Sequence, residues 1–159
     1  MKIFLTVGSM LPFDRLVKAM DRWAGTTPYA EVFGQIGETH YQPINFEFSK
    51  MISPSEYRSR LSSCDLVVSH AGMGTVITAS EIGRPLIVLP RHPEWAEVTS
   101  NHQLATAKWL AKTPGVRVVD TEDDLASAIA EAQGSASIES QDKSARLQLI
   151  TELKNFINS

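Results

Sequence analysis

The sequence predicts an α/β protein with a doubly wound parallel sheet and helices on both faces. Two short apolar runs, residues 66–68 and 86–89, enclose a segment of helical length, and neither run alternates with polar residues. Strands of a parallel sheet, which are covered on both faces, have this composition. A second unit of strand, glycine-containing loop and helix opens the chain at residues 3–24. Together these observations predict a Rossmann-like fold.

The bulk composition is that of an ordinary globular domain. The 159 residues are 43% hydrophobic and 21% charged, which is enough for one sizeable core. The net charge of −3 argues against a broad surface for nucleic acid or anionic lipid. The single cysteine, Cys64, excludes an internal disulfide and is typical of a reducing compartment. No apolar run approaches the roughly 18 residues of a membrane span, and residues 1–7 are too short for a secretory signal, so we expect a cytoplasmic protein.

The first half of the chain begins with a strand at residues 3–7 and a helix at 13–24. A second strand follows at 30–35. Residues 44–48 alternate apolar and polar side chains and are expected to form a partly exposed strand. Ser53 and Glu56 form a capping box around a proline, so we expect a helix from there to about residue 63.

The central unit places a polar, glycine-rich bend at residues 69–74 and a helix at 75–82. An irregular loop at 91–100 precedes a helix that opens at Asn101. A short strand is expected at 116–119, followed by a helix capped by Thr121 and ending near Ala132.

Three regions follow from this pattern. Residues 1–132 form the predicted ligand-binding domain, and residues 133–142, rich in Gly, Ser and Gln, read as a linker. Residues 143–159 form an amphipathic helix with an apolar stripe made of Leu149, Ile150, Leu153, Phe156 and Ile157. This stripe either packs back on the domain or docks on a partner, and the sequence favours neither.

Four loops leave the carboxyl ends of predicted strands and would meet at one cleft. They contain Gly8 and Ser9, residues 35–38, residues 70–74 and residues 91–103. Open α/β sheets bind ligands at this edge. The glycines at 72 and 74 allow close backbone approach, and the following helix points its free N–H groups at the same place. We therefore expect a site for an anion such as a diphosphate, although such glycines also occur only to make a turn.

The motifs in these loops resemble a known family. They are Val7-Gly8-Ser9, residues 12–17, residues 34–37, residues 69–75 and Asn101-His102-Gln103. The chain to about Ala132 is similar to the carboxyl-terminal, donor-binding domain of family-28 glycosyltransferases. The similarity is greatest to stand-alone subunits, namely the eukaryotic dolichol-linked UDP-GlcNAc transferase catalytic subunit and a bacterial exopolysaccharide glucuronosyltransferase subunit. Pro90, Arg91 and Glu97 also occur in the pattern of the bacterial members, which this part of the chain resembles most.

The resemblance implies one half of a two-domain GT-B glycosyltransferase. Such a subunit would bind a UDP-sugar and transfer a hexosyl or uronosyl group to a lipid-linked saccharide acceptor. A membrane-anchored partner subunit would hold that acceptor and recruit this chain peripherally to the inner face of the membrane, in exopolysaccharide or cell-surface glycan synthesis. We expect no cofactor besides the UDP-sugar substrate and no metal, since no metal-ligand spacing of His and Cys is present.

Glycosyl transfer develops negative charge on the departing diphosphate, which pre-oriented N–H dipoles or a cation must stabilise. Arg91 is a candidate cation, or else a solvated arginine, and His70 either binds phosphate or braces its loop. Asn101 and Gln103 are expected to bind sugar hydroxyls, although Asn101 would also serve as a helix cap. The expected donor-binding residues are Gly8, Ser9, His70, Gly72, Met73, Gly74, Thr75, Thr78, Arg91, Asn101 and Gln103.

Two departures from the family pattern stand out. Relatives usually carry a ribose-binding glutamate where this chain has Thr78, and Glu81 lies almost one turn later. No catalytic base is evident: His92 and Glu97 are candidates, and the family pattern also allows the base to lie on the partner.

Other functions remain open at this point. The main alternative is a non-catalytic nucleotide-binding regulatory domain, and a third is a fragment of a nucleotide-sugar epimerase or hydrolase. A dinucleotide enzyme is disfavoured because residues 8–12 lack the second and third glycines of that fingerprint. An exposed cleft and apolar tail would favour a homodimer of the isolated chain, which we treat as a hypothesis.

Overall fold

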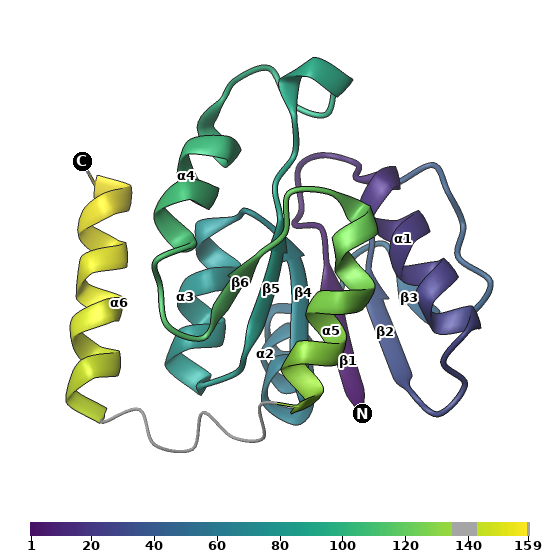
Figure 1. Cartoon of the computed structure of the whole chain (residues 1–159), viewed down its shortest axis with the longest axis horizontal. Helices are drawn as coiled ribbons and strands as arrows, with labels where there is room; N and C mark the ends of the chain where they lie inside the picture. Colours follow the sequence, from purple (N-terminus) through teal and green to yellow (C-terminus); the bar gives the residue numbers. More distant parts are fainter. Residues whose placement is uncertain (135–142, 159) are drawn as a thin grey trace.

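The computed structural model describes residues 1–134 and 143–158, and it contains a six-stranded parallel sheet in the order β3-β2-β1-β4-β5-β6 (Figure 1). The strands are β1 Lys2–Thr6, β2 Glu31–Gln35, β3 Glu47–Ser49, β4 Leu66–His70, β5 Leu86–Leu89 and β6 Val116–Val118. All five neighbouring pairs are parallel. This confirms the predicted doubly wound, Rossmann-like fold.

Helices cover both faces of the sheet. They are α1 Asp14–Gly25, α2 Pro54–Ser63, α3 Met73–Ile82, α4 His102–Leu110, α5 Leu125–Gly134 and α6 Lys143–Asn158, with short 3₁₀ turns η1 Pro93–Trp95 and η2 Glu122–Asp124. Helices α1 and α5 enclose one apolar core against the sheet (Figure 1). Helices α2, α3, α4 and α6 contribute to the second core on the opposite face.

Local sequence explains where several helices begin and end. The Ser53 hydroxyl accepts the Glu56 N–H at 3.2 Å and caps α2 as predicted. Helix α3 starts at Met73, two residues before the expected start, so Gly74 lies in its first turn. Gly83 ends α3 in the left-handed conformation, with φ of 78°, which glycine adopts at little cost.

The edge strand differs from the prediction for residues 44–48. Only Glu47–Ser49 pairs with β2, and Ile44 is 86% exposed. The cause is Asp21 of α1, a buried carboxylate that accepts the backbone N–H groups of Ile44 and Asn45. These bonds hold the two residues against α1 and delay the start of the strand.

Two further boundaries differ after β6. The Thr121 hydroxyl donates to the Asp124 carboxylate, and η2 precedes the helix, so α5 begins only at Leu125. Helix α5 extends through Gly134, so Gln133 and Gly134 of the predicted linker are helical. The remaining predicted linker residues, 135–142, lie outside the described part of the chain.

Helix α6 packs back on the domain beside α3 (Figure 1). Leu153 is fully buried and Ile150 is 8% exposed, whereas Leu147 is 60% exposed. Phe156 stacks on Trp109 of α4, with ring centroids 5.1 Å apart. The side chains of Leu149 and Ile157 lie outside the described part of the structure. The described apolar residues of the stripe, Ile150, Leu153 and Phe156, therefore pack within the chain.

Among the described residues, no helix combines the length and apolarity that a bilayer crossing needs.

The order in which successive strands are added to the sheet changes direction between β1 and β4, which are adjacent and parallel. Loops that leave the carboxyl ends of these two strands run to opposite sides and open a crevice between them. This is where a ligand site is expected.

Candidate functional site

A cleft of about 600 Å³ occupies the crevice at the carboxyl ends of β1 and β4. Nine of the eleven expected donor-binding residues line it, namely Gly8, Ser9, His70, Gly72, Gly74, Thr75, Thr78, Arg91 and Gln103. Met73 and Asn101 do not line it. The structure therefore brings together residues from three of the four predicted loops, and Gln35 of the fourth.

The imidazole of His70 fills the centre of the loop layer between two glycines. A Cβ atom at Gly8 would lie 2.8 Å from His70 Cε1, and a Cβ at Gly72 would lie 2.5 Å from the same atom. Gly8 also has a φ of 80°, in the left-handed region that favours glycine. These two glycines make room for the histidine ring, so they have a packing role that the sequence pattern did not reveal.

Burial and the nearby positive charge of Arg91 together lower the pKa of His70 from 6.5 to about 4. His70 is therefore neutral at pH 7 in the free protein. Its Nδ1 atom is buried and makes no hydrogen bond of normal geometry within the described residues. The ring packs between Gly8 and Gly72, as bracing of the loop requires, and a contact of His70 with phosphate stays a prediction.

The first turn of α3 presents unpaired donors to the cleft. Gly72 caps the helix without a side-chain bond, and the first bond of the helix is from Val76 N to Gly72 O, at 3.2 Å. Within the described chain, the N–H groups of Met73, Gly74 and Thr75 make no hydrogen bond. A Cβ at Gly74 would meet nothing within 4 Å. Free N–H groups, a positive helix dipole end and open space together form an anion site.

Arg91 is held in the wall of the cleft. It is 2% exposed, which excludes the solvated arginine considered from the sequence. Its Nε donates to Pro12 O at 3.2 Å, and its Nη2 donates to Val7 O at 2.8 Å and Leu11 O at 2.7 Å. The guanidinium also lies over the Phe13 ring, with 4.7 Å from Cζ to the ring centroid.

Arg91 makes no direct ion pair within the described part of the chain, although the negative charge of Glu97 lies near enough to raise its pKa. Its Nη1 also makes no hydrogen bond among the described residues. Burial lowers its pKa from 12.5 to about 10, so it remains protonated at pH 7. A buried cation that makes no direct ion pair favours binding of an anion in the adjoining cleft.

The amide of Gln103 faces the same wall. Its Oε1 accepts the Arg91 backbone N–H at 2.9 Å, which leaves the amide NH₂ group available for a ligand. Asn101 has the N-cap position of α4 but makes no side-chain capping bond, so the capping alternative does not describe it. Asn101 does not line the cleft, so its expected contact with sugar stays a prediction.

The two residues near the usual ribose position have different surroundings. Thr78 lines the cleft, and its hydroxyl donates to Gly74 O one turn earlier at 2.9 Å. Glu81 instead pairs with Lys154 of α6 at 3.8 Å, outside the lining. Of the two, only Thr78 is placed to contact a nucleotide.

The two candidate bases lie outside the cleft lining. Both carboxylate oxygens of Glu97 are bonded by the Arg15 guanidinium, at 3.0 and 3.1 Å. The His92 ring packs against Trp95, with centroids 4.4 Å apart. A base must reach the acceptor hydroxyl. A role as base stays a prediction for both residues.

Several lining residues had no motif that would single them out. They are Thr6, Met10, Leu11, Met51, Ile52 and Tyr57. Tyr57 of α2 bonds Thr75 of α3 through their hydroxyl oxygens, 2.8 Å apart. Residues 51–57 follow the carboxyl end of β3, and that position was the signal available in the sequence.

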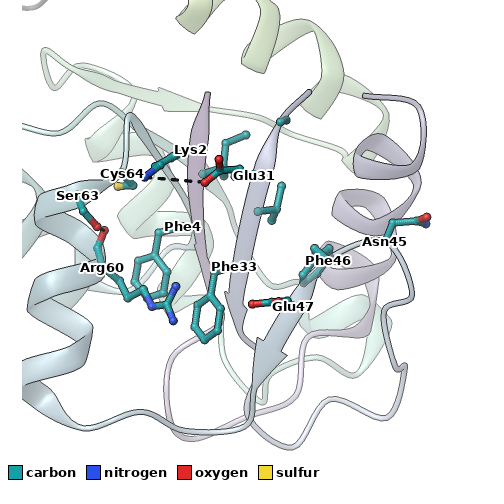
Figure 2. Close-up of a pocket in the computed structure, with 13 residues that line it drawn as sticks. Lys2, Phe4, Glu31, Phe33, Asn45, Phe46, Glu47, Arg60, Ser63 and Cys64 are labelled. Atoms are coloured by element: carbon teal, nitrogen blue, oxygen red, sulfur yellow. Dashed lines mark hydrogen bonds and ion pairs between the residues drawn. The ribbon is translucent and has the colours of Figure 1, made fainter. Parts of the chain in front are cut away.

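A second pocket of about 470 Å³ lies toward the amino ends of β1 and β2 (Figure 2). Phe4, Phe33 and Arg60 line it, with the Arg60 guanidinium over the Phe33 ring, and Lys2 pairs with Glu31 of the neighbouring strand at 3.9 Å (Figure 2). No expected site residue lines it. It faces away from the edge where open α/β sheets bind ligands, so the cleft is the better candidate.

The described residues contain no group of three or more His, Cys, Asp or Glu side chains arranged to hold a metal ion. That donor binding needs no metal stays a prediction.

Comparisons with known proteins agree with this geometry. Residues 2–155 match the glycosyltransferase family 28 C-terminal domain. The chain is 30% identical over 121 residues to the UDP-N-acetylglucosamine transferase subunit ALG13 of Homo sapiens, covering 69% of this chain and 10% of that protein. It is 31% identical over 84 residues to the Prochlorococcus marinus (strain MIT 9312) UDP-N-acetylglucosamine--N-acetylmuramyl-(pentapeptide) pyrophosphoryl-undecaprenol N-acetylglucosamine transferase, covering 50% of this chain and 22% of that protein.

A solution structure of ALG13 resembles the fold, with a TM-score of 0.65 at 19% identity, and the match covers 95% of each chain. The chain spans less than a quarter of the length of the two relatives matched by sequence. The family match covers almost the whole described chain and every loop of the cleft. The chain therefore belongs to the family-28 glycosyltransferases and corresponds to their C-terminal domain.

Proposed function

We propose that this chain binds the diphosphate of a UDP-sugar in the β1–β4 cleft and supplies the donor half of a glycosyltransferase. The observation that carries the proposal is the buried Arg91 guanidinium, which makes no direct ion pair among the described residues, together with the free N–H groups of α3. Both favour negative charge, and they come from different elements. A glycine loop that serves only as a turn needs neither a buried cation nor free N–H groups.

These groups suit the chemistry of glycosyl transfer. The departing UDP gains negative charge as the bond between sugar and phosphate breaks. Donors and a cation that are already oriented stabilise this charge without reorganising. The names of the two relatives describe transfer of N-acetylglucosamine from UDP, which supports a UDP-sugar donor.

The transferred group is a hexosyl or uronosyl unit, and the acceptor is a lipid-linked saccharide held by a second, membrane-anchored subunit. The human relative is itself named as a transferase subunit. Glu97 and His92 lie outside the cleft lining, which fits a catalytic base on the other half. This half is then recruited to the inner face of the membrane for exopolysaccharide or cell-surface glycan synthesis.

Calorimetric titration with UDP, UDP-glucose, UDP-glucuronate and UDP-GlcNAc tests donor binding. Gly74→Asp adds a carboxylate where a side chain has open space, so the fold should survive and UDP binding should be lost. Gly74→Asn is the matched control, because it adds similar bulk without charge and should retain part of the affinity. Equal binding by all three proteins would place the diphosphate elsewhere, and no binding by the wild type would contradict donor binding by this chain.

A further inference from the structure

The segment between β5 and α4 connects two residues of the cleft but has little regular structure of its own. Arg91 lies near its start and Gln103 lies just after it, in the first turn of α4, with only the 3₁₀ turn η1 between them. Ala96 has a φ of 55°, a left-handed conformation that costs a non-glycine residue energy. The path of this segment must therefore be fixed by contacts with other elements.

Arg15 of α1 makes the main contacts. Its Nε and Nη2 donate to the two oxygens of Glu97, at 3.1 and 3.0 Å. Nη2 also donates to Pro90 O at 2.9 Å, and Nη1 donates to Glu122 at 3.0 Å. The planar guanidinium lies over the Trp95 ring, 4.4 Å from its centroid. Only arginine offers such a fork of donors together with a stacking face.

Glu97 also holds the start of the segment in place. Its Oε1 accepts the His92 backbone N–H at 3.0 Å as well as the Arg15 bond. The Arg15 and Glu97 side chains are 14% and 12% exposed, so water competes little with the pair. The fork thus holds both the start and the middle of the segment against α1.

The two arginines connect the same two walls in opposite directions. Arg15 reaches from α1, just after the β1–α1 loop, to the segment at 91–101. Arg91 reaches from that segment back to the carbonyls of Val7, Leu11 and Pro12 in the β1–α1 loop. The relative position of the two walls, and so the width of the cleft between them, depends on both.

We infer that Arg15 and Glu97 are positioning residues of the donor cleft, whose ion pair places Arg91 and Gln103 without touching the ligand. The inference rests on the proposed function and deepens it, because it assigns Glu97 a role other than catalytic base. Both oxygens of Glu97 are occupied by the fork, and Glu97 lies outside the lining of the cleft.

The experiment compares Arg15→Lys and Glu97→Gln with wild type. Lysine keeps the positive charge but loses the two-pronged fork, and glutamine keeps the shape of glutamate but loses its charge. Arg22→Lys is the matched control, because Arg22 is an exposed arginine on the same helix without an ion pair among the described residues. UDP affinity is measured by calorimetry, and hydrogen exchange compares residues 92–101 with β4.

The expected result is faster exchange in residues 92–101 of both variants, with β4 unchanged, and UDP affinity lower by about tenfold to a hundredfold. Arg22→Lys should match the wild type in both measurements. A merely structural role would lower the melting temperature without a selective effect on the segment or on affinity.

Wild-type exchange in residues 92–101, or wild-type UDP affinity in both variants, would overturn the inference. If the wild type itself binds no UDP, the proposed function fails instead. The exchange comparison then decides on its own whether the ion pair fixes the segment.

Discussion

The two glycines of the Gly72-Met73-Gly74 bend serve different purposes although they are two residues apart. A side chain at Gly72 would collide with the His70 ring, which Gly8 confines from the other side. A side chain at Gly74 would enter open space in the cleft. Gly72 is therefore required by the fold, and Gly74 by the proposed ligand.

Alanine at each glycine should separate these purposes. Gly72→Ala forces the His70 ring to move and should lower the free energy of unfolding by about 1–3 kcal/mol. Gly74→Ala removes backbone freedom from a helical residue and should raise the free energy of unfolding by up to about 1 kcal/mol. The added methyl group should also weaken UDP binding. Urea denaturation and calorimetry measure the two effects. Unweakened UDP binding by Gly74→Ala would show that the ligand does not approach this residue.

The sequence located the glycine bend because a strand, a bend and a helix leave a recognisable local pattern. It did not reveal that Gly72 packs against His70, since the ring is confined by Gly8, which is remote in the sequence. Nor did it distinguish a solvated Arg91 from a buried one. That distinction depends on carbonyl groups of a different loop, and no local pattern records it.

At the scale of elements, α6 shows how an apolar stripe is used within the chain. Leu153 is fully buried in the core that also contains Val76 and Ala79 of α3, while Leu147 remains 60% exposed on the same helix. The sequence stripe predicted the helix and its apolar side but left the covering surface open. Helix α3 provides that surface in the structure.

Two leucine-to-alanine changes on α6 test this packing. Leu153→Ala should lower the free energy of unfolding by about 2–5 kcal/mol, because it leaves a cavity in the core. Leu147→Ala removes the same atoms from an exposed site and should change it by less than about 0.5 kcal/mol. Chemical denaturation of both variants gives the comparison. Equal small effects would mean that α6 is detached from α3 in solution.

The start of β3 was harder to predict than the start of α2. The Ser53 cap acts within one turn, so the sequence shows it directly. The start of β3 is set by Asp21, whose carboxylate binds Ile44 and Asn45 from a distant helix. The alternation at residues 44–48 was present, but this tertiary contact overrode it.

At the scale of the whole molecule, net charge does not favour an anionic ligand. The chain carries −3 at pH 7, so its overall field repels a nucleoside diphosphate. The cleft counters this locally, with a buried guanidinium and a helix amino terminus close to neutral His70. The same buried groups also determine how the stability of the entire fold depends on pH.

On the alkaline side, burial raises the pKa of the Cys64 thiol from 9.0 to about 11. The unfolded chain loses this proton first, so the free energy of unfolding falls as the pH rises from about 9 to about 11. Arg91 acts in the opposite direction above its folded pKa of about 10, because the folded protein releases its proton more readily than the unfolded chain. Stability should therefore be highest between about pH 6.5 and 9, where neither the thiol nor His70 opposes folding.

On the acidic side, His70 should dominate the loss of stability between pH 6.5 and 4. Its folded pKa of about 4 lies below the ordinary 6.5, so the unfolded chain binds the proton first. The free energy of unfolding then falls with decreasing pH by about 3 kcal/mol across this window. Urea denaturation at several pH values measures that slope, and His70→Gln should abolish most of it whatever its effect at pH 7. A diphosphate in the cleft would favour protonated His70, so UDP should raise the pKa of His70 observed by NMR. An unchanged pKa in the presence of bound UDP would place the diphosphate away from the histidine.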